Sequence, residues 1–157
     1  MALTEQEIRA SYPFPVYNYR VEIGTTAVAF SEVSGLSISY GTTVYKESPT
    51  EPGAPGPRKR IMPAQIKDPT VTLKKGLVPS VSIKDLYQWI GRTSTNQIEK
   101  RDVYVHLCDE KGATVISWKI VNAFPTKVDA PSFSASSDDA AIESMELIAD
   151  FITVEEA

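Results

Sequence analysis

Residues 102–123 decide the fold class, and they read DVYVHLCDEKGATVISWKIVNA. Val or Leu stands at every second position of residues 102–108, and a similar alternation returns over residues 114–123. A period of two residues is typical of a β-strand with one buried face. The DEKG sequence between the two runs is typical of a turn. The stretch therefore predicts an antiparallel hairpin.

The chain as a whole is biased toward β structure. It contains 14 Val, 13 Ile and 13 Thr but only 7 Leu among 157 residues. Residues branched at Cβ lose side-chain freedom in helices and pack well on a pleated sheet. Further strands are expected over residues 17–23, 27–31, 36–45 and 70–76, with a turn at 24–26, a bend at Gly35, a helix over 83–93 capped by Ser82, and an irregular stretch between Pro125 and Pro131.

Both terminal segments fit more than one structure. Residues 1–12 are polar and fit either a short helix or a flexible arm. Residues 140–154 fit helical spacing, and they also fit strand alternation from Met145 to Phe151. We interpret this last segment as a strand.

Residues 46–63 mark a sharp change of composition. They read KESPTEPGAPGPRKRIMP and hold five of the eleven prolines and two of the eight glycines. Proline has no N–H to donate to a strand ladder, so an irregular loop is expected here. We therefore divide a single domain over residues 1–157 into a body, an N-terminal arm over 1–16 and an extended Pro-rich loop over 46–66.

Composition argues against several functions. One Cys excludes an internal disulfide and a Cys-based zinc site, and one His argues against a multi-histidine metal site. No apolar run approaches the roughly 18 residues that span a bilayer. The first residues lack the basic and apolar regions of a secretory signal, so folding in a cytoplasm is expected. A net charge of −4 argues mildly against nucleic acid as the main partner.

Four clusters contain residue types that occur in functional sites. They are His106 with Cys108, Asp138 with Asp139, Glu143 with Glu146, and the basic run over residues 58–60. His106 and Cys108 share a strand face, but a metal needs three or four ligands and no further His or Cys exists. Adjacent acids more often cap an element or form a solvated face than act in acid–base catalysis. A short basic run on an acidic protein is more typical of a partner-facing loop than of a phosphate site.

The remaining pattern favours an interaction or assembly module over an enzyme. Several expected strands carry small or polar residues on their second face, such as Ser37, Thr72 and Glu146. A sheet of this kind has one face in a core and the other toward water or a lumen. The long Pro-rich loop suits docking to a neighbour. We expect no catalytic residue, no metal and no cofactor.

The sequence also resembles a known family along most of its length. The resemblance is carried by YPFPVYNYRVEI (12–23), FSEVSGLSISYGTTVYKE (30–47), VTLKKG (71–76), LYQWI (86–90), NQIEKRDVYVHLCDEKG (96–112) and WKIVNAFPTKVDAPSFSASSDDAAIESMELIAD (118–150). These pieces resemble tail tube proteins of contractile-tailed phages. Within that superfamily they are most similar to the inner tube proteins of extracellular contractile injection systems.

The resemblance implies a mainly β fold, a small antiparallel barrel or sandwich with one short helix, similar to the haemolysin-coregulated protein of type VI secretion. It implies hexameric rings that stack into a rigid hollow tube, which a contracting sheath drives through a target envelope. The implied partners are further copies of the chain, the sheath protein, baseplate and spike proteins, a tube cap or terminator, and protein cargo in the lumen. The monomer is not expected to insert into a membrane.

The resemblance leaves two alternatives open. In the family, the region of the Pro-rich loop is part of an extended hairpin that reaches the adjacent ring. The loop over residues 48–62 is longer and richer in proline than expected for the repeated subunit, which is compatible with a baseplate-proximal tube initiator that joins spike to tube. A phage tail tube that conveys DNA is the second alternative. In each case, assembly in the producer cytoplasm and incorporation in a released extracellular particle or virion tail are implied.

Candidate site residues follow from the expected surfaces. Contacts between rings or subunits are expected at Tyr12, Pro13, Pro15, Lys46, Glu47, Arg58, Lys59, Arg60, Asp138 and Asp139, with the basic run facing the two aspartates of an adjacent subunit. Lumen-facing residues are expected at Ser37, Ser39, Thr70, Thr72, Glu146 and Asp150.

Overall fold

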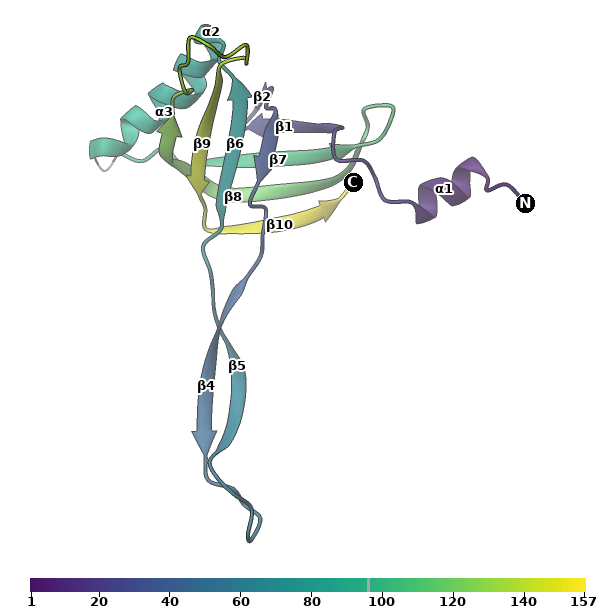
Figure 1. Ribbon diagram of the computed structural model, residues 1–157, viewed down its shortest axis with the longest axis vertical. Helices are drawn as coiled ribbons and strands as arrows, with labels where there is room; N and C mark the ends of the chain where they lie inside the picture. The colour runs from purple at the N-terminus through teal and green to yellow at the C-terminus, as the bar shows by residue number, and fades with distance from the viewer. Residues whose placement is uncertain (96) are drawn as a thin grey trace.

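The computed structural model describes residues 1–95 and 97–157. Its body is a strongly bent antiparallel sheet of eight strands in the order β2-β1-β7-β8-β9-β6-β3, with β10 paired to β8. A short N-terminal helix and a long two-stranded hairpin leave this body in different directions (Figure 1). The predicted mainly β, antiparallel fold is confirmed.

The elements have the following bounds. The strands are β1 (Tyr19–Ile23), β2 (Thr26–Val28), β3 (Glu32–Ser34), β4 (Tyr40–Glu47), β5 (Arg58–Ile66), β6 (Thr70–Gly76), β7 (Arg101–Cys108), β8 (Thr114–Asp129), β9 (Ile142–Ile148) and β10 (Phe151–Glu156). The helical segments are α1 (Glu5–Ser11), α2 (Pro79–Ser82), the π-helical turn η1 (Ile83–Tyr87), α3 (Gln88–Gly91) and the 3₁₀ turn η2 (Arg92–Thr95). None of these helices has the length and apolarity that crossing a bilayer requires.

The predicted hairpin over residues 102–123 is present, and its second strand is longer than expected. The first half of β8 pairs with β7 and β10, and its second half pairs with β9. Asn122 lies between the halves with φ +53°; its N–H donates to Asp102 and its side-chain amide to Asp150. The expected irregular stretch at Pro125 is wrong, because Pro125 lies at a register shift where its missing N–H is tolerated.

The core lies between the bent sheet and the helical segment. Val71, Leu73, Met145 and Leu147 are fully buried on one face of β6 and β9. Trp89 lies in the same core cluster and brings the helical segment onto the sheet. The predicted alternation of Met145 and Leu147 in a strand is therefore confirmed.

The helical segment begins earlier than predicted, and the positions that it buries differ from the predicted apolar stripe. Val78 is the N-cap residue, so Ser82 lies within the helix and does not cap it. A π turn widens the helix at residues 83–87, and the buried positions become Ser82, Leu86 and Trp89. Ile83, which the regular helical spacing assigns to the apolar stripe, is exposed.

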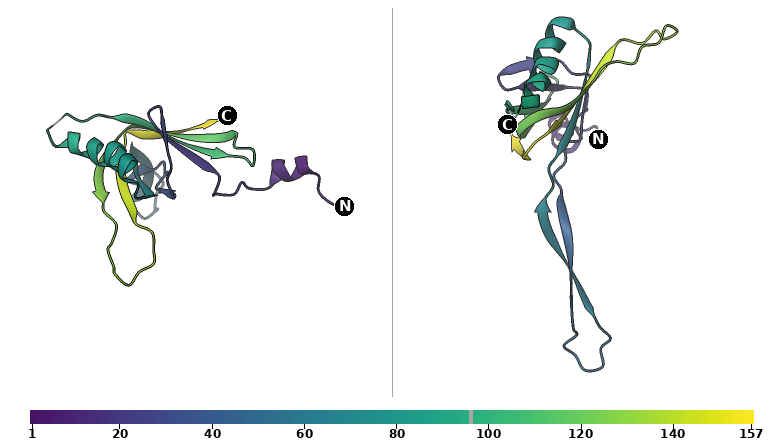
Figure 2. Two further views of the ribbon diagram at one scale, coloured as in Figure 1. Left: turned by 90° about the horizontal axis from the view of Figure 1, so that it is seen from above. Right: turned by 90° about the vertical axis from the view of Figure 1, so that its left-hand side faces the viewer.

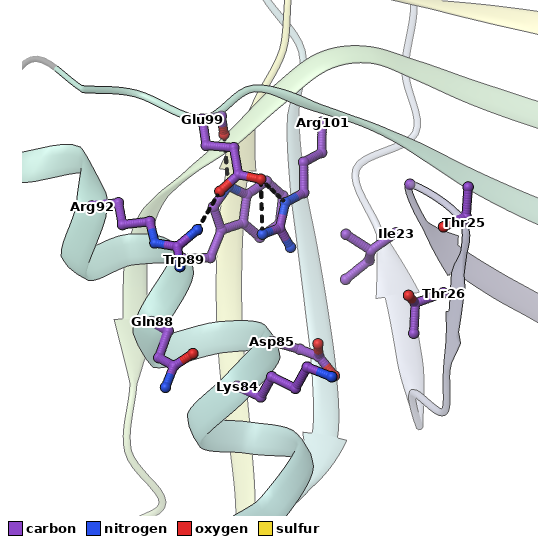
Figure 3. Close-up of a pocket in the computed structure, with 11 residues that line it drawn as sticks. Ile23, Thr25, Thr26, Lys84, Asp85, Gln88, Trp89, Arg92, Glu99 and Arg101 are labelled. Carbon is purple, nitrogen blue, oxygen red and sulfur yellow. Dashed lines mark hydrogen bonds and ion pairs between the residues drawn. The ribbon is translucent and has the colours of Figure 1, made fainter.

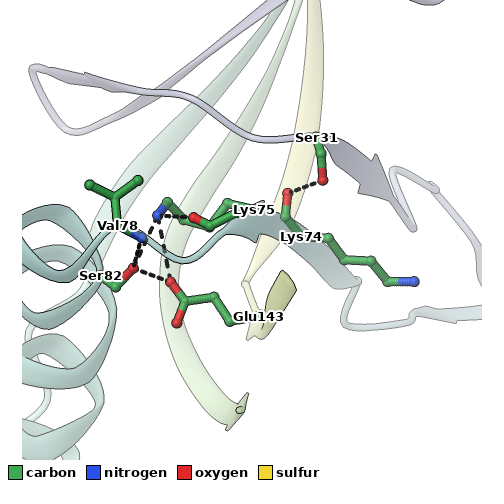
Figure 4. Close-up of polar contacts among 7 residues, drawn as sticks. Ser31, Lys74, Lys75, Val78, Ser82 and Glu143 are labelled. Carbon is green, nitrogen blue, oxygen red and sulfur yellow. Dashed lines mark hydrogen bonds and ion pairs between the residues drawn. The ribbon is translucent and has the colours of Figure 1, made fainter. Parts of the chain in front are cut away.

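A buried polar cluster attaches the helical segment to β6 and β9 (Figure 4). The Ser82 hydroxyl donates to Oε1 of Glu143, and Nζ of Lys75 lies 3.5 Å from the same oxygen. Lys75 also donates to Ser82 Oγ at 3.1 Å and to the carbonyl of Gly76 at 2.8 Å. A buried ion pair is tolerated when further hydrogen bonds satisfy it, as they do for Lys75.

Three strand boundaries differ from expectation. The expected strand over 27–31 is the shorter β2, and β3 follows it unpredicted. Residues 35–39 lie outside any strand, so the strand expected over 36–45 begins at Tyr40. The expected bend at Gly35 is present, with φ +87°.

The segment over 140–154 is two strands instead of one. Residues 149–150 separate β9 from β10. Strand β9 pairs with β6, whereas β10 pairs with the first half of β8. The side-chain alternation resets at this corner. Phe151 is therefore exposed although the uninterrupted alternation places it with Met145.

Candidate assembly surfaces

The Pro-rich segment forms an arm that projects from the body. Strands β4 and β5 pair from Tyr40 with Ile66 to Glu47 with Arg58, with a register shift between Tyr40 and Thr42, and residues 48–57 at the tip lie outside both strands (Figure 1). The expectation of an irregular loop is therefore wrong for residues 46–47 and 58–66. An isolated two-stranded hairpin can include Pro63, because the outer edges of both strands are free.

The two faces of the arm carry different chemistry. Residues directly opposite each other in an antiparallel pair point to the same face. One face carries the pair Val44 with Ile61, followed by the pair Lys46 with Lys59. The other face carries Tyr45 opposite Arg60 and Glu47 opposite Arg58, with Met62 adjacent. Both faces are open, since Val44 on one face is 51% exposed and Tyr45 on the other is 52% exposed.

Glu47 forms ion pairs with both arginines of the basic run within the arm. Its Oε1 lies 2.7 Å from Nη2 of Arg58 and 2.8 Å from Nε of Arg60. The hydrogen bond from Arg58, and then the charge of Arg60, lower the pKa of the Glu47 carboxyl below its usual value. Lys59, on the opposite face, is not part of this cluster.

The N-terminal arm exposes a second set of apolar side chains. Helix α1 has no buried residue and is tethered by an ion pair from Arg9 to Glu110 in the β7–β8 turn. Tyr12, Pro13 and Pro15 are exposed in the extended link between α1 and β1. The link passes an apolar hollow of about 380 Å³, which is lined by Phe14, Val16, Tyr19, Val33, Leu36, Val105, Leu107 and Trp118 together with Ser31 and Glu32.

A third projection is the loop over residues 130–141 between β8 and β9. Phe133 in this loop is 86% exposed. Asp139 accepts a hydrogen bond from Ser137 at 3.1 Å, and both Asp138 and Asp139 are exposed. The loop and the hairpin arm leave the body at different ends, so one chain does not bring its own aspartates to its own basic run (Figure 2).

The expected lumen residues fall in three places. Thr70, Thr72 and Glu146 lie on β6 and β9, and Thr72 is paired directly with Glu146 on the face away from the core. Ser37 and Ser39 lie in the connection to the hairpin arm. Asp150 lies at the corner after β9, where it accepts a hydrogen bond from Asn122.

A charged hollow beside the helical segment has no counterpart among the sequence predictions. Its volume is about 430 Å³, and Glu99 in its wall accepts from Arg92 at 2.8 Å and from Arg101 at 3.2 Å (Figure 3). Arg101, and then Arg92, lower the pKa of the Glu99 carboxyl. The Arg101 guanidinium lies over the ring of Trp89, 4.8 Å from the ring centroid. These ion pairs link the helical segment to β7.

The residue pair His106 and Cys108 has structural contacts. Nδ1 of His106 lies 2.6 Å from Oγ of Ser117, and its ring stacks on that of Tyr104. Cys108 is buried. Within the part of the chain that the structure describes, no group of three or more His, Cys, Asp and Glu side chains is placed to hold a metal ion.

The fold and these surfaces define a class of protein. A small antiparallel β body with exposed apolar arms and open strand edges is a subunit that associates with other chains. The family described as T4-like virus tail tube protein gp19 matches residues 15–153. The chain belongs to this tail tube family.

Solved structures agree with this assignment over nearly the whole chain. A chain of the extended PVC sheath–tube complex, from an extracellular contractile injection system, is 34% identical with a TM-score of 0.88, covering 99% of this chain and 100% of that one. A chain of the anti-feeding prophage tube terminating cap is 35% identical with a TM-score of 0.83, covering all of both chains. A chain of the extended PVC sheath/tube terminator is 36% identical with a TM-score of 0.82, covering 92% of this chain and 98% of that one. No curated protein matches the sequence.

Proposed function

We propose that the chain is the repeated structural subunit of the inner tube of a contractile injection system. The near-complete alignment with a chain of the PVC sheath–tube complex, at a TM-score of 0.88, carries the proposal. Rings of the subunit stack into a hollow tube, and contraction of the sheath drives that tube through a target envelope. The role depends on shape and self-association and requires no catalytic residue, metal or cofactor.

Ring formation uses the strand edges of the body. Strands β2 and β3 end the sheet, and β10 pairs with β8 alone among the described strands. Pairing between edges of neighbouring copies removes open edges and closes a large barrel around a lumen. Six copies carry six times −4, or −24, formal charges. The polar face of β6 and β9, with Thr72 and Glu146, is our choice for the lumen wall.

The proposed role defines the partners. Chains similar to this one occur in sheath–tube, tube cap and sheath/tube terminator structures. We assign the chain the same kinds of partner, together with baseplate and spike proteins at the other end of the tube and protein cargo in the lumen. The tube assembles in the producer cytoplasm and becomes part of a released extracellular particle.

A tube initiator next to the baseplate is the second candidate. A chain of the anti-feeding prophage baseplate shares the fold, with a TM-score of 0.72, at 17% identity. The identity to a chain of the sheath–tube complex is twice as high, at 34%, which favours the repeated subunit. The copy number in intact particles separates the two roles. An initiator forms a single ring in each particle, whereas the repeated subunit forms many rings. A DNA-conveying phage tail would contain DNA in its lumen.

The first prediction concerns the assembly state of the purified chain. We expect six-fold rings or stacked tubes in negative-stain micrographs, and a size-exclusion peak near six times 17.2 kDa or larger. The physical reason is the set of open edges and exposed apolar arms on the monomer. A protein that runs at 17.2 kDa at every concentration and gives no rings contradicts the proposal.

A further inference from the structure

The hairpin arm keeps one pair of cations without a partner. Lys46 and Lys59 are directly opposite each other on one face, whereas Glu47 binds Arg58 and Arg60 on the other face. Within the described residues neither lysine forms an ion pair. Like charges directly opposite each other destabilise a hairpin. An anionic partner placed on this face would relieve that repulsion.

The same face offers an apolar neighbour to the lysine pair. Val44 and Ile61 precede Lys46 and Lys59 by two residues along each strand, or roughly 7 Å. Both apolar side chains are more than half exposed. A partner that fits this face therefore carries an exposed apolar anchor with carboxylates close to it.

The loop over residues 130–141 carries that combination. Phe133 is 86% exposed, and Asp138 and Asp139 follow five and six residues later, after a turn. Asp138 makes no hydrogen bond or ion pair within the described part of the chain, and Asp139 is bound only to Ser137. The apolar anchor and the two carboxylates are complementary in kind to the Val44–Ile61 pair and the lysine pair.

The hairpin arm and the rest of the chain carry opposite net charges, which favours contact between copies. Residues 40–66 hold four cationic and two acidic side chains, a net charge of +2, so the other 130 residues carry −6. The loop over 130–141 alone contributes −2. A basic arm on an acidic body attracts a second copy of the same chain and repels a basic partner.

The two elements leave opposite ends of the body. The hairpin extends along the longest axis, and the loop lies at the other end of the body in Figure 1 and in the right view of Figure 2. A contact between them therefore joins two copies head to tail. Such a heterologous contact repeats without closing, which gives an open stack.

We propose that the loop over 130–141 of one copy docks on the Lys46–Lys59 face of the hairpin of a copy in the next ring. Phe133 packs on Val44 and Ile61, and Asp138 and Asp139 bind the two lysines. The inference rests on the proposed tube function. Resemblance to the family already implies that the hairpin reaches the adjacent ring, and the new element is the loop over 130–141 that receives it.

Two charge-reversed variants test this contact. The hairpin variant combines Lys46→Glu with Lys59→Glu, and the loop variant combines Asp138→Lys with Asp139→Lys. Each variant alone places like charges on both sides of every axial contact, so we expect rings but a loss of tubes. In an equal mixture of preformed rings, each contact between unlike rings pairs opposite charges, and we expect alternating tubes to form. Negative-stain microscopy counts rings and tubes in all samples.

Controls separate this contact from general charge effects. Lys84→Glu with Lys111→Glu makes the same charge change away from the arm and is expected to leave tubes unchanged. Phe133→Ser is expected to shorten tubes at least twofold while rings persist.

Several outcomes overturn the inference. Tubes from the hairpin variant alone, or a mixture that gives no tubes, overturn the contact while wild-type tubes uphold the proposed function. Rescue of the hairpin variant by Glu155→Lys with Glu156→Lys, and not by the loop variant, overturns the choice of loop. Wild-type protein that forms neither rings nor tubes overturns the proposed function, and this inference with it.

Discussion

Gly35 and Gly112 have similar backbone φ angles but differ in the space available for a side chain. Their φ angles are +87° and +80°, in the left-handed region that favours glycine. At Gly35, a Cβ atom would collide with the carbonyl oxygen of Thr70 in β6. At Gly112, a Cβ atom would have no neighbour within 4 Å. Gly35 therefore serves both the bend and the close approach of β3 to β6.

This difference gives a prediction at the residue scale. Gly112→Ala is expected to lower the free energy of unfolding by about 1 kcal/mol, from the unfavourable φ alone. Gly35→Ala is expected to cost about 1–3 kcal/mol more, because the backbone of β6 must move. Urea unfolding of ring-free protein measures both values. Equal losses for the two variants would show that the close approach to Thr70 has no energetic consequence.

At the scale of elements, the helical segment is held by two polar contacts at its two ends. Ser82 bonds to Glu143 near its beginning, and Arg92 bonds to Glu99 near its end. Trp89 lies between them, buried in the core, and its indole N–H donates to the carbonyl of Glu99 at 2.7 Å. The segment is therefore positioned by named side chains as well as by apolar burial.

The Glu99 contact gives a prediction about pH. The folded state lowers the pKa of the Glu99 carboxyl, so its stabilising effect is present above the unfolded pKa and is lost as the pH falls through the folded pKa. Glu99→Gln is expected to reduce stability at pH 7 by up to about 1 kcal/mol, a value limited by solvent exposure. At pH 3 the difference from wild type is expected to shrink. Thermal unfolding at both pH values measures it.

A matched substitution checks this interpretation. Glu51 lies exposed in the irregular tip of the hairpin arm, so Glu51→Gln is expected to leave the melting temperature unchanged at both pH values. If Glu99→Gln destabilised the protein equally at pH 7 and pH 3, loss of packing rather than loss of charge would be the cause.

At the scale of the whole molecule, the hairpin arm is separable from the body. All nine residues of β5 are exposed, so the arm contributes little to the core. Its ends are adjacent, since the N–H of Lys67 donates to the carbonyl of Ser39 at 2.8 Å. A two-residue turn can therefore replace the arm without straining the body.

Removal of the arm gives a prediction for assembly. Replacement of residues 40–66 by Asn-Gly is expected to change the free energy of unfolding of the body by less than about 0.5 kcal/mol. Rings are expected to form from the remaining edges, but tubes are not, because the arm is our proposed axial contact. Microscopy and size exclusion distinguish rings from tubes. Deletion of residues 49–57 alone is a milder variant, and tubes of normal length and stability from it would contradict an axial role for the tip.

The sequence predicted the elements whose burial follows a local period. The alternation over residues 102–108 identifies β7, and the alternation from Met145 identifies β9, because a strand places every second side chain on one face. Predictions from this period were wrong where the backbone departs from regular strand or helix geometry. The π turn at 83–87 moved the buried stripe of the helix, and the corner at 149–150 exposed Phe151.

The sequence identified charged segments that are exposed in the structure, but not the contacts that they make within the chain. The basic run over 58–60 and the acidic pair at 138–139 were identifiable as exposed charges. The register of β4 against β5 then decided which cations lie beside a carboxylate, since it places Glu47 opposite Arg58 and Lys46 opposite Lys59. A shift by one residue would exchange the two faces, and composition holds no information about that shift.

By itself, the sequence determined the mainly β fold class, the tail tube resemblance and the change of composition over residues 46–63. These features depend on the period of the side chains, on turn residues and on charge. All three can be recognised from residues that are close together in the sequence. Only the tertiary structure decided how β4 and β5 of the Pro-rich arm are paired, and that Lys46 and Lys59 have no partner among the described residues. It also decided that this arm and the loop over 130–141 leave opposite ends of the body. Those properties depend on strand register and chain direction, which are set when distant segments pack together.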